Sequence, residues 1–515
     1  MYIYGRKCRY FGLTAITFSW RENSWVRIFV AGVQRYAAVL ADLQMAARKR
    51  SLGIPLHFSF DQEGGSSADF CFGGVNIFPK PMGLTATGDK ELTYKAALET
   101  ARQSRAVGFN WVHSPVLDIC SEPRNPEIYT RSYSDDPAVV ADYAAETCRG
   151  LRDGGVIATG KHFPGRGHSC QDAHFGVPVI DVDRETMERR ELRPYRALIA
   201  QGLLPSIMIA HSIFPAIDPD NIATVSRKVI TGLLREELGF EGVITTDSMT
   251  MGAIATRYGV ANACAMALAA GADLVLMKAE NELGETVDTI KAFVADGRLP
   301  IEELNDKVYR ILALKHQYGL FEEPDAARDP EREVRDPAVK ALAAEIARKS
   351  ILVARDADKL LPLPTDKKIL VVEQKVKEYN DMQWHSGILY EACMRQSRHV
   401  DYQETAYSYA DKTAIMARAR DYDLLVITSY FLRGKLSNRE WLEGFLADCK
   451  TPAVIVTNTP FEEISIPKNA RNVVITFATS PANVKATAEV LFGKCKAEGK
   501  MPVKNGISVS AEAMV

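Results

Sequence analysis

The sequence contains no apolar run of the roughly 18 residues that a membrane-spanning helix needs. Its nine cysteines are scattered and never spaced as C-x-x-C, which indicates reduced thiols and argues against a disulfide framework or a zinc site. Neither sign of charge is in large excess, because the chain has 63 Lys and Arg and 65 Asp and Glu, which gives a net charge of −2. Binding to nucleic acid or to an anionic membrane surface therefore has no electrostatic support.

The remaining composition is typical of a globular protein, with 47% hydrophobic and 25% charged residues over 515 positions. The first residues partly imitate a secretion signal, since basic residues precede a short apolar run, but no small-residue cleavage site follows. β-Branched and aromatic residues dominate positions 13–18, which favours a buried strand there. We therefore expect a cytoplasmic protein.

Short apolar runs alternate with helical patterns through residue 325, which indicates a parallel α/β sheet covered on both faces. A doubly wound open sheet fits this alternation, as does a TIM-type (β/α)8 barrel. Polar residues at the strand ends favour the barrel, because its active site lies where the carboxyl ends of the strands converge. The expected strands are 13–18, 55–61, 109–118, 156–163, 206–211, 242–247 and 272–277, and the polar residues at their ends are Asp61, Asp118, His162, His211, Asp247 and Lys278.

Seven strands are one fewer than a closed (β/α)8 barrel requires, so the first βα unit is either absent from this chain or irregular within residues 1–12. The barrel-like catalytic domain is expected over 1–325. A charged, Pro-containing segment at 326–348 predicts a linker that ends in a helix. Apolar runs within 349–515 predict a smaller α/β/α sandwich domain with a parallel sheet, and the polar segment after Lys500 predicts a loose tail.

The densest polar cluster is KHFPGRGHSCQDAH at 161–174, at the end of an expected strand. Its histidines and aspartate place several titratable groups on one glycine-containing, mobile loop. A metal site built from His162, His168, Asp172 and His174 is one interpretation, although neither an H-x-H pair nor a helical HExxH is present. An inert structural loop is another.

Two carboxylates add to the candidate site. Asp247 closes an apolar strand in GVITTDSMTMGA, and the hydroxyl groups beside it suit a nucleophile that is held ionised. Taken alone, Asp247 is better explained as the N-cap of the next helix. Asp61 in FDQEGG precedes glycines that allow a tight turn, and an ionised carboxylate there can accept hydrogen bonds from two adjacent sugar hydroxyls.

Together these motifs resemble glycoside hydrolase family 3, in particular its β-N-acetylhexosaminidase branch. The resemblance covers nearly the whole first domain, and the second domain is similar to the sandwich appended in two-domain members. It implies a hydrolase of small oligosaccharides that needs neither a metal nor another cofactor. The resemblance rests on the motifs FDQEGG, NPEIYTRSYSDDP, KHFPGRGxxxxDxH, IMIAHSIFPAIDP and ITTDSMTMGA, in this order and spacing.

The resemblance also implies roles for individual residues. Asp247 would be the catalytic nucleophile, and His174, oriented by Asp172, would be the general acid/base. Retaining glycosidases usually use two carboxyl groups for these roles. A histidine can replace one of them, because an adjacent carboxylate stabilises the imidazolium and fixes its tautomer. The residues that would hold the sugar in the −1 subsite are Asp61, Arg131, Lys161 and His162.

The sequence departs from the family in the loop after Asp61. The branch usually continues with two arginines after DQEGG, whereas this chain has Ser66 and Asp69 at the corresponding places. We therefore expect the −1 subsite to lack one charge-assisted contact. The alternative is that Asp69 faces solvent and that Arg166 or Arg124 fills the vacancy.

The expected function is that of a retaining β-N-acetylglucosaminidase acting on peptidoglycan or chitin fragments, including muropeptides. A β-glucosidase or β-xylosidase, whose acid/base glutamate comes from the second domain, and a β-glycoside phosphorylase are alternatives within the fold. A catalytically inactive carbohydrate-binding protein is an alternative from another class. Glu440 and Glu443 of the second domain lie in a helical pattern that a solvated face explains.

Overall fold

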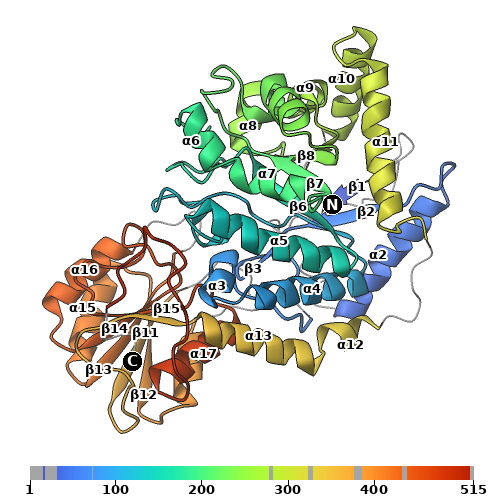
Figure 1. Cartoon of the computed structure of the whole chain (residues 1–515). Helices are drawn as coiled ribbons and strands as arrows, with labels where there is room; N and C mark the ends of the chain where they lie inside the picture. Colours follow the sequence, from blue (N-terminus) through green and yellow to red (C-terminus); the bar gives the residue numbers. More distant parts are fainter. Residues whose placement is uncertain are drawn as a thin grey trace.

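The computed structural model describes residues 15–17, 32–71, 73–277, 282–322, 329–375, 386–431 and 438–510. Residues 1–12, which the sequence leaves as a place for an irregular first strand, lie outside these ranges, as does Lys278. Two α/β halves with separate sheets make up the molecule (Figure 1). The domain boundaries at 325 and 349 stay predictions.

In the part of the chain that the structure describes, the first sheet has seven strands, and every pairing within it is parallel. It contains each strand that the apolar runs predict, so the parallel α/β class is confirmed. Among the described residues β1 and β9 are the edges of this sheet, and closure into an eight-stranded barrel stays a prediction. In chain order, which is also the sheet order, the strands are β1 (Ala15–Thr17), β2 (His57–Phe60), β5 (Trp111–Val112), β6 (Ile157–Phe163), β7 (Ser206–Ile209), β8 (Val243–Ser248) and β9 (Leu274–Leu276).

Helices connect these strands and cover the sheet, which leaves β2, β5, β6 and β7 buried along their whole length. The longest among the described residues, α4 (Lys90–Val107), is capped by Asp89, whose carboxylate accepts from the Glu91 N–H, and is followed by Gly108 in a left-handed conformation. A short hairpin, β3 (Gln62–Gly64) with β4 (Ser67–Ala68), follows β2. The helices of this half are α2 (Val33–Arg48), α3 (Pro81–Ala86), α4 (Lys90–Val107), η1 (Tyr129–Arg131), α5 (Pro137–Asp153), α6 (Arg184–Arg189), α7 (Arg193–Ala200), η2 (Ala223–Val225), η3 (Lys228–Glu237), α8 (Gly252–Tyr258), α9 (Val260–Ala270), α10 (Leu283–Ala295) and α11 (Ile301–Gln317).

The second sheet has six strands and differs from the expectation in two ways. β10 pairs antiparallel with β15, so this sheet is mixed and not wholly parallel. β12 was not expected, because its sequence VDYQET is polar and half-exposed, as the edge of a sheet allows. The strand order is β10 (Leu352–Asp356), β15 (Asn472–Ile475), β14 (Ala453–Thr457), β13 (Leu424–Ser429), β11 (Ile369–Gln374) and β12 (Val400–Thr405), with helices α14 (Ile388–Met394), α15 (Tyr409–Ala419), α16 (Arg439–Asp448) and α17 (Pro481–Leu491).

Two segments connect the halves, the helical segment 330–350 and the segment after Lys500. Helix α12 (Pro330–Val334) contacts α2 and α4, and helix α13 (Pro337–Ser350) packs against α3 and α4 and also against α17 (Figure 1). The segment after Lys500 is not a loose tail as its polarity suggested. Asp135 accepts from the backbone N–H groups of Lys504 and Asn505 at 2.7 and 2.9 Å, and the Ser134 hydroxyl donates to the Pro502 carbonyl at 2.6 Å. A polar segment is ordered when its backbone groups find such partners.

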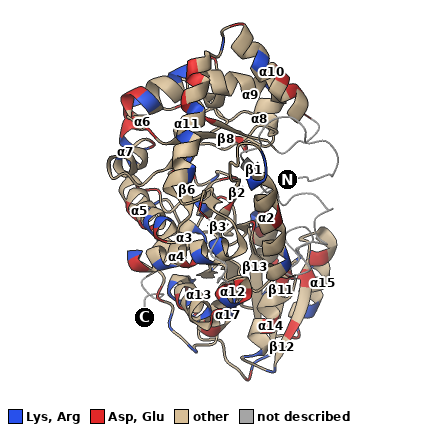
Figure 2. Cartoon of the chain, turned by 90° about the vertical axis from the view of Figure 1, so that its right-hand side faces the viewer, with Lys and Arg blue, Asp and Glu red and all other residues tan. Residues whose placement is uncertain are grey.

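Lys and Arg positions alternate with Asp and Glu positions along the helices (Figure 2), in keeping with a net charge of −2. Among the described residues no helix is both long enough and apolar enough to cross a membrane.

Lys315 is buried at the end of the first sheet that lies opposite the strand carboxyl ends. It lies on α11, is 0% exposed, and donates from Nζ to the Pro55 carbonyl at 2.7 Å. Burial, aided by Arg50, lowers the pKa of Lys315 from 10.5 to about 7. The unfolded chain therefore binds this proton up to about pH 10.5 and the folded chain only up to about pH 7, so this group makes stability rise with pH between those values.

We expect Lys315→Met to raise the free energy of unfolding at pH 6 by about 2 kcal/mol, because it removes an unfavourable buried charge at the loss of one hydrogen bond. At pH 10 the variant should gain nothing. Urea unfolding at both pH values measures this, with Lys291→Met on the exposed face of α10 as the control. Equal effects of Lys315→Met at the two pH values would contradict the burial of a titrating amine.

Candidate active site

Ionisable side chains gather where the strands of the first sheet end. Asp61 follows β2, His113 follows β5 and His211 follows β7. Lys161 and His162 lie near the end of β6, and Asp247 lies near the end of β8. Because neighbouring parallel strands end at the same edge, these side chains converge on one site, as the polar strand ends predicted.

Asp247 is a largely buried carboxylate whose side chain is 15% exposed. Its Oδ1 accepts from the Ser248 N–H at 2.7 Å, and its Oδ2 lies 3.5 Å from Arg166 NH1. Burial alone would raise the pKa of Asp247, but the positive charge of Arg166 and the Ser248 hydrogen bond hold that pKa well below its usual range. Asp247 is therefore ionised at neutral pH, as a carboxylate nucleophile must be.

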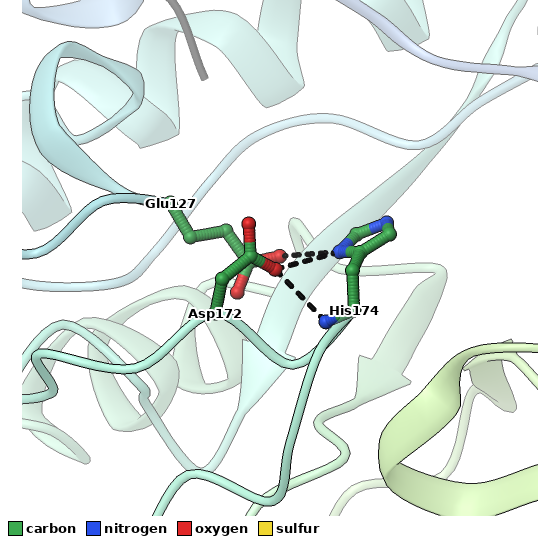
Figure 3. A group of neighbouring side chains, drawn as sticks. All are labelled: Glu127, Asp172 and His174. Carbon is green, nitrogen blue, oxygen red and sulfur yellow. Dashed lines mark hydrogen bonds and ion pairs between the residues drawn. The ribbon is translucent and has the colours of Figure 1, made fainter. Parts of the chain in front are cut away.

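His174 lies in a turn in which Phe175 N–H donates to the Asp172 carbonyl. The Asp172 carboxylate accepts from both His174 Nδ1, at 2.8 Å, and the His174 backbone N–H, at 2.9 Å. A carboxylate only accepts, so Nδ1 carries the proton and a second proton on the imidazole would lie on Nε2. Figure 3 shows Nε2 on the side of the ring away from Asp172. The pair thus has the orientation that a histidine acid/base needs.

The turn of His174 is docked on the segment that follows Asp247. Ala253 N–H donates to the Ala173 carbonyl at 3.2 Å. Gly252 allows the close approach, because a Cβ there would lie 2.6 Å from the His174 carbonyl oxygen. The two expected catalytic groups are therefore held by adjoining backbone, and the loop is packed more closely than the mobile loop that its glycines suggested.

Asp61 is the accessible member of a buried ion-pair group. Lys161 Nζ lies 2.6 Å from both Asp61 Oδ1 and Glu63 Oε1, and the Asp61 side chain is 47% exposed. Arg131 makes a bidentate contact with Glu63 at 2.7 and 2.8 Å, and its NH1 donates to the Glu127 carbonyl. Burial would raise the pKa of Glu63, but Arg131 and Lys161 lower it to about 2. The buried cations orient carboxylates here, and their contact with a sugar stays a prediction.

His162 is fixed between Asp118 and Arg166. Arg166 NH2 donates to His162 Nε2 at 2.9 Å, so Nδ1 carries the proton and donates to Asp118 Oδ2 at 2.7 Å. Burial raises the pKa of Asp118 to about 6, against the opposing charge of Arg166. The Nε2 atom of His162 lies 4.0 Å from Asp247 Oδ2, which places this histidine beside the expected nucleophile.

Glu63 and Glu127 had no expected role, and Arg166 was expected only as a replacement for a missing arginine. Glu63 and Glu127 stand inside motifs that carry the family resemblance, but neither ends a strand and no spacing marks them. Arg166 lies beside Asp247, whereas Arg124 is exposed and pairs with Glu122. That Arg166 replaces the missing arginine stays a prediction. Asp69 accepts from the Asp61 backbone N–H at 3.1 Å.

Of the four residues in the metal interpretation, Asp172 and His174 lie together, and His162 and His168 do not join them. Among the described residues the group that could share an ion is Glu127, Asp172 and His174, whose ligand atoms lie within 4.8 Å of one another, whereas His162 binds Asp118 and His168 lies 3.2 Å from the Ser121 hydroxyl. Arg166 NH2 lies 2.9 Å from Glu127 Oε1, so a guanidinium already provides the positive charge there.

We therefore expect EDTA to leave glycosidase activity unchanged. Initial rates before and after dialysis against the chelator measure this, with an untreated sample carried through the same dialysis as the control. Loss of activity that a divalent ion restores would contradict a metal-independent site.

The model of the glycosyl hydrolase family 3 N terminal domain matches residues 30–314, more than half of the chain. The chain belongs to glycosyl hydrolase family 3. It is therefore a glycoside hydrolase, and its similarity extends to members named for N-acetylhexosamine substrates.

Three relatives span nearly all of this family 3 chain. The β-hexosaminidase A of Pseudoalteromonas piscicida is 26% identical over 92% of the chain and 88% of its own length. A β-N-acetylglucosaminidase/β-glucosidase of Cellulomonas fimi is 29% identical over 91% and 86%. A solved family 3 β-N-acetylglucosaminidase from Paenibacillus sp. str. FPU-7 is 30% identical, covers 97% of this chain and 94% of its own, and superposes with a TM-score of 0.88.

Proposed function

We propose that this family 3 enzyme is a retaining β-N-acetylglucosaminidase that forms a covalent glycosyl-aspartate on Asp247. The observation that carries the proposal is the buried, ion-paired Asp247 next to the docked turn that holds the His174–Asp172 pair. A nucleophile near the end of a strand and an acid/base on the turn packed beside it are the groups that a double displacement requires.

In the first step of this mechanism, a carboxylate oxygen of Asp247 bonds to the anomeric carbon of the sugar. The glycosidic C–O bond breaks, and the leaving oxygen takes the proton from Nε2 of His174. In the second step, water gives a proton back to Nε2 while its oxygen replaces Asp247 on the anomeric carbon. Asp172 keeps Nδ1 protonated throughout, so that one tautomer serves both steps.

The proposed substrates are small oligosaccharides with a terminal β-linked N-acetylglucosamine, namely chitin fragments or muropeptides of peptidoglycan. The names of the relatives support the N-acetylhexosamine. Asp61 is the proposed sugar-binding carboxylate, because it is half-exposed and its Oδ1 is held by the buried ammonium group of Lys161. In this proposal the acid/base is neither Glu440 nor Glu443 of α16, and Glu443 accepts from the Lys468 backbone N–H within its own half.

The testing experiment compares 4-nitrophenyl N-acetyl-β-glucosaminide with 4-nitrophenyl β-glucoside, each with and without inorganic phosphate. We expect the N-acetylglucosaminide to be hydrolysed faster, without phosphate dependence, and to release the β-anomer first. Formation of a sugar 1-phosphate would replace hydrolysis by phosphorolysis, and preference for the glucoside would favour a β-glucosidase. Absence of turnover with both substrates would favour a carbohydrate-binding protein.

A further inference from the structure

Arg166 lies between Asp247 and the turn of His174, the two groups that carry out the reaction in the proposed function. It is 2% exposed. Its NH1 lies 3.5 Å from Asp247 Oδ2, and its NH2 lies 2.9 Å from Glu127 Oε1. Its backbone N–H donates to Asp118 at 2.7 Å, which fixes the start of the side chain. One guanidinium thus pairs with the expected nucleophile and with a second buried carboxylate.

Glu127 is that second carboxylate, and it faces the same ring nitrogen as Asp172. His174 Nδ1 lies 2.8 Å from Asp172 Oδ1 and 3.6 Å from Glu127 Oε1. In Figure 3 both carboxylates lie on the Nδ1 side of the imidazole. Glu127 Oε2 also accepts from the Ala173 N–H at 3.4 Å, within the turn that carries His174. Glu127 is 2% exposed, so these contacts are made out of water.

The charges along the series Asp247, Arg166, Glu127 and His174 alternate in sign. Asp247 is negative, Arg166 positive, Glu127 negative, and His174 becomes positive whenever it holds the proton for the leaving group. Without Arg166, no cation would lie among the carboxylates of Asp247, Glu127 and Asp172, and these would repel one another. Without Glu127, the guanidinium would lose its buried partner, and the turn of His174 would lose an acceptor for the Ala173 N–H.

We propose that Glu127 and Arg166 are positioning residues that couple the acid/base to the nucleophile, an inference that rests on the proposed function. Glu127 is the second carboxylate beside the Nδ1–H of His174, and it accepts from the backbone of the turn that carries His174. Arg166 fixes the positions of the Glu127 and Asp247 carboxylates relative to each other. Neither residue gives or takes a proton. The coupling therefore acts on steps in which His174 transfers a proton at Nε2, and much less on attack by Asp247 when no proton is needed.

The test is Glu127→Gln, with Glu122→Gln as the matched control. Glu122 lies on the same loop and also pairs with an arginine, Arg124. For N,N′-diacetylchitobiose, whose leaving group needs protonation, we expect Glu127→Gln to lower kcat/KM by about 50-fold. For the 2,4-dinitrophenyl N-acetylglucosaminide, which does not, the loss should be less than about 5-fold. Glu122→Gln should match the wild type with both substrates.

A second measurement keeps the proposal testable if Glu127→Gln is damaged as a whole. A 5-fluoro N-acetylglucosaminyl fluoride should label Asp247 in the folded variant at a rate near that of the wild type, because fluoride departs without an acid. Arg166→Met should slow this labelling, because it also removes the cation paired directly with Asp247. In the double variant with Glu127→Gln the losses on chitobiose should be less than additive.

Equal losses on the two substrates, slow labelling in Glu127→Gln, or additive losses in the double variant would overturn the positioning role. Failure of the proposed function is a separate result, because it would be seen in the wild-type enzyme as lack of turnover of either N-acetylglucosaminide.

Discussion

Replacing Asp247 with alanine is expected to lower kcat by about four orders of magnitude, because a nucleophile is removed from groups that act as a unit. Asp247 is held ionised by Arg166 and by the Ser248 N–H, and alanine offers the anomeric carbon nothing to bond to. Initial rates with 4-nitrophenyl N-acetyl-β-glucosaminide measure the loss. KM should change far less, since the sugar contacts proposed for Asp61 remain.

The matched control for this prediction is Asp296→Ala, which removes an exposed carboxylate paired with Arg298. It should keep wild-type activity. A loss of less than tenfold in Asp247→Ala, in a variant that unfolds at the wild-type temperature, would show that another group attacks the sugar.

Replacing His174 with alanine should separate substrates by their leaving groups. The loss in kcat/KM should reach about 10³-fold for chitobiose and stay near tenfold for the dinitrophenyl glycoside, because only the former needs protonation in the first step. Added azide should speed the second step by attacking the glycosyl-enzyme without a general base. Steady-state rates with both substrates, with and without azide, measure the two effects.

His168→Ala is the control from the same loop, since His168 lies against the Ser121 hydroxyl and apart from the Asp172–His174 pair. It should not distinguish the substrates. Equal losses in His174→Ala across leaving groups, with no response to azide, would mean that His174 binds the substrate and does not act on protons.

Apolar runs predicted each strand of the first sheet, because strands covered on both faces must be apolar throughout. The same logic could not find β12, whose mostly polar residues suit a sheet edge. It also could not give the direction of β10, since direction depends on how the chain returns and not on composition. The ordered segment after Lys500 depends on acceptors more than 300 residues earlier, such as Asp135, which no local pattern contains.

The site was predictable where residues lie at or just beyond strand ends, as Asp61, His211 and Asp247 do. The supporting groups were not. Glu63 and Glu127 become informative only when the fold brings Lys161, Arg131 and Arg166 against them. Long-range pairing of buried charges leaves no periodicity in a sequence, so this part of the site required the structure.

Trapping of the glycosyl-enzyme tests the proposed mechanism most directly. The enzyme is incubated with a 5-fluoro N-acetylglucosaminyl fluoride, digested and mapped by mass spectrometry. We predict one added sugar per chain, on the peptide that contains Asp247, with slow recovery of activity as water releases it. A label on another residue, or no label together with release of the α-anomer from the chromogenic substrate, would contradict a covalent intermediate on Asp247.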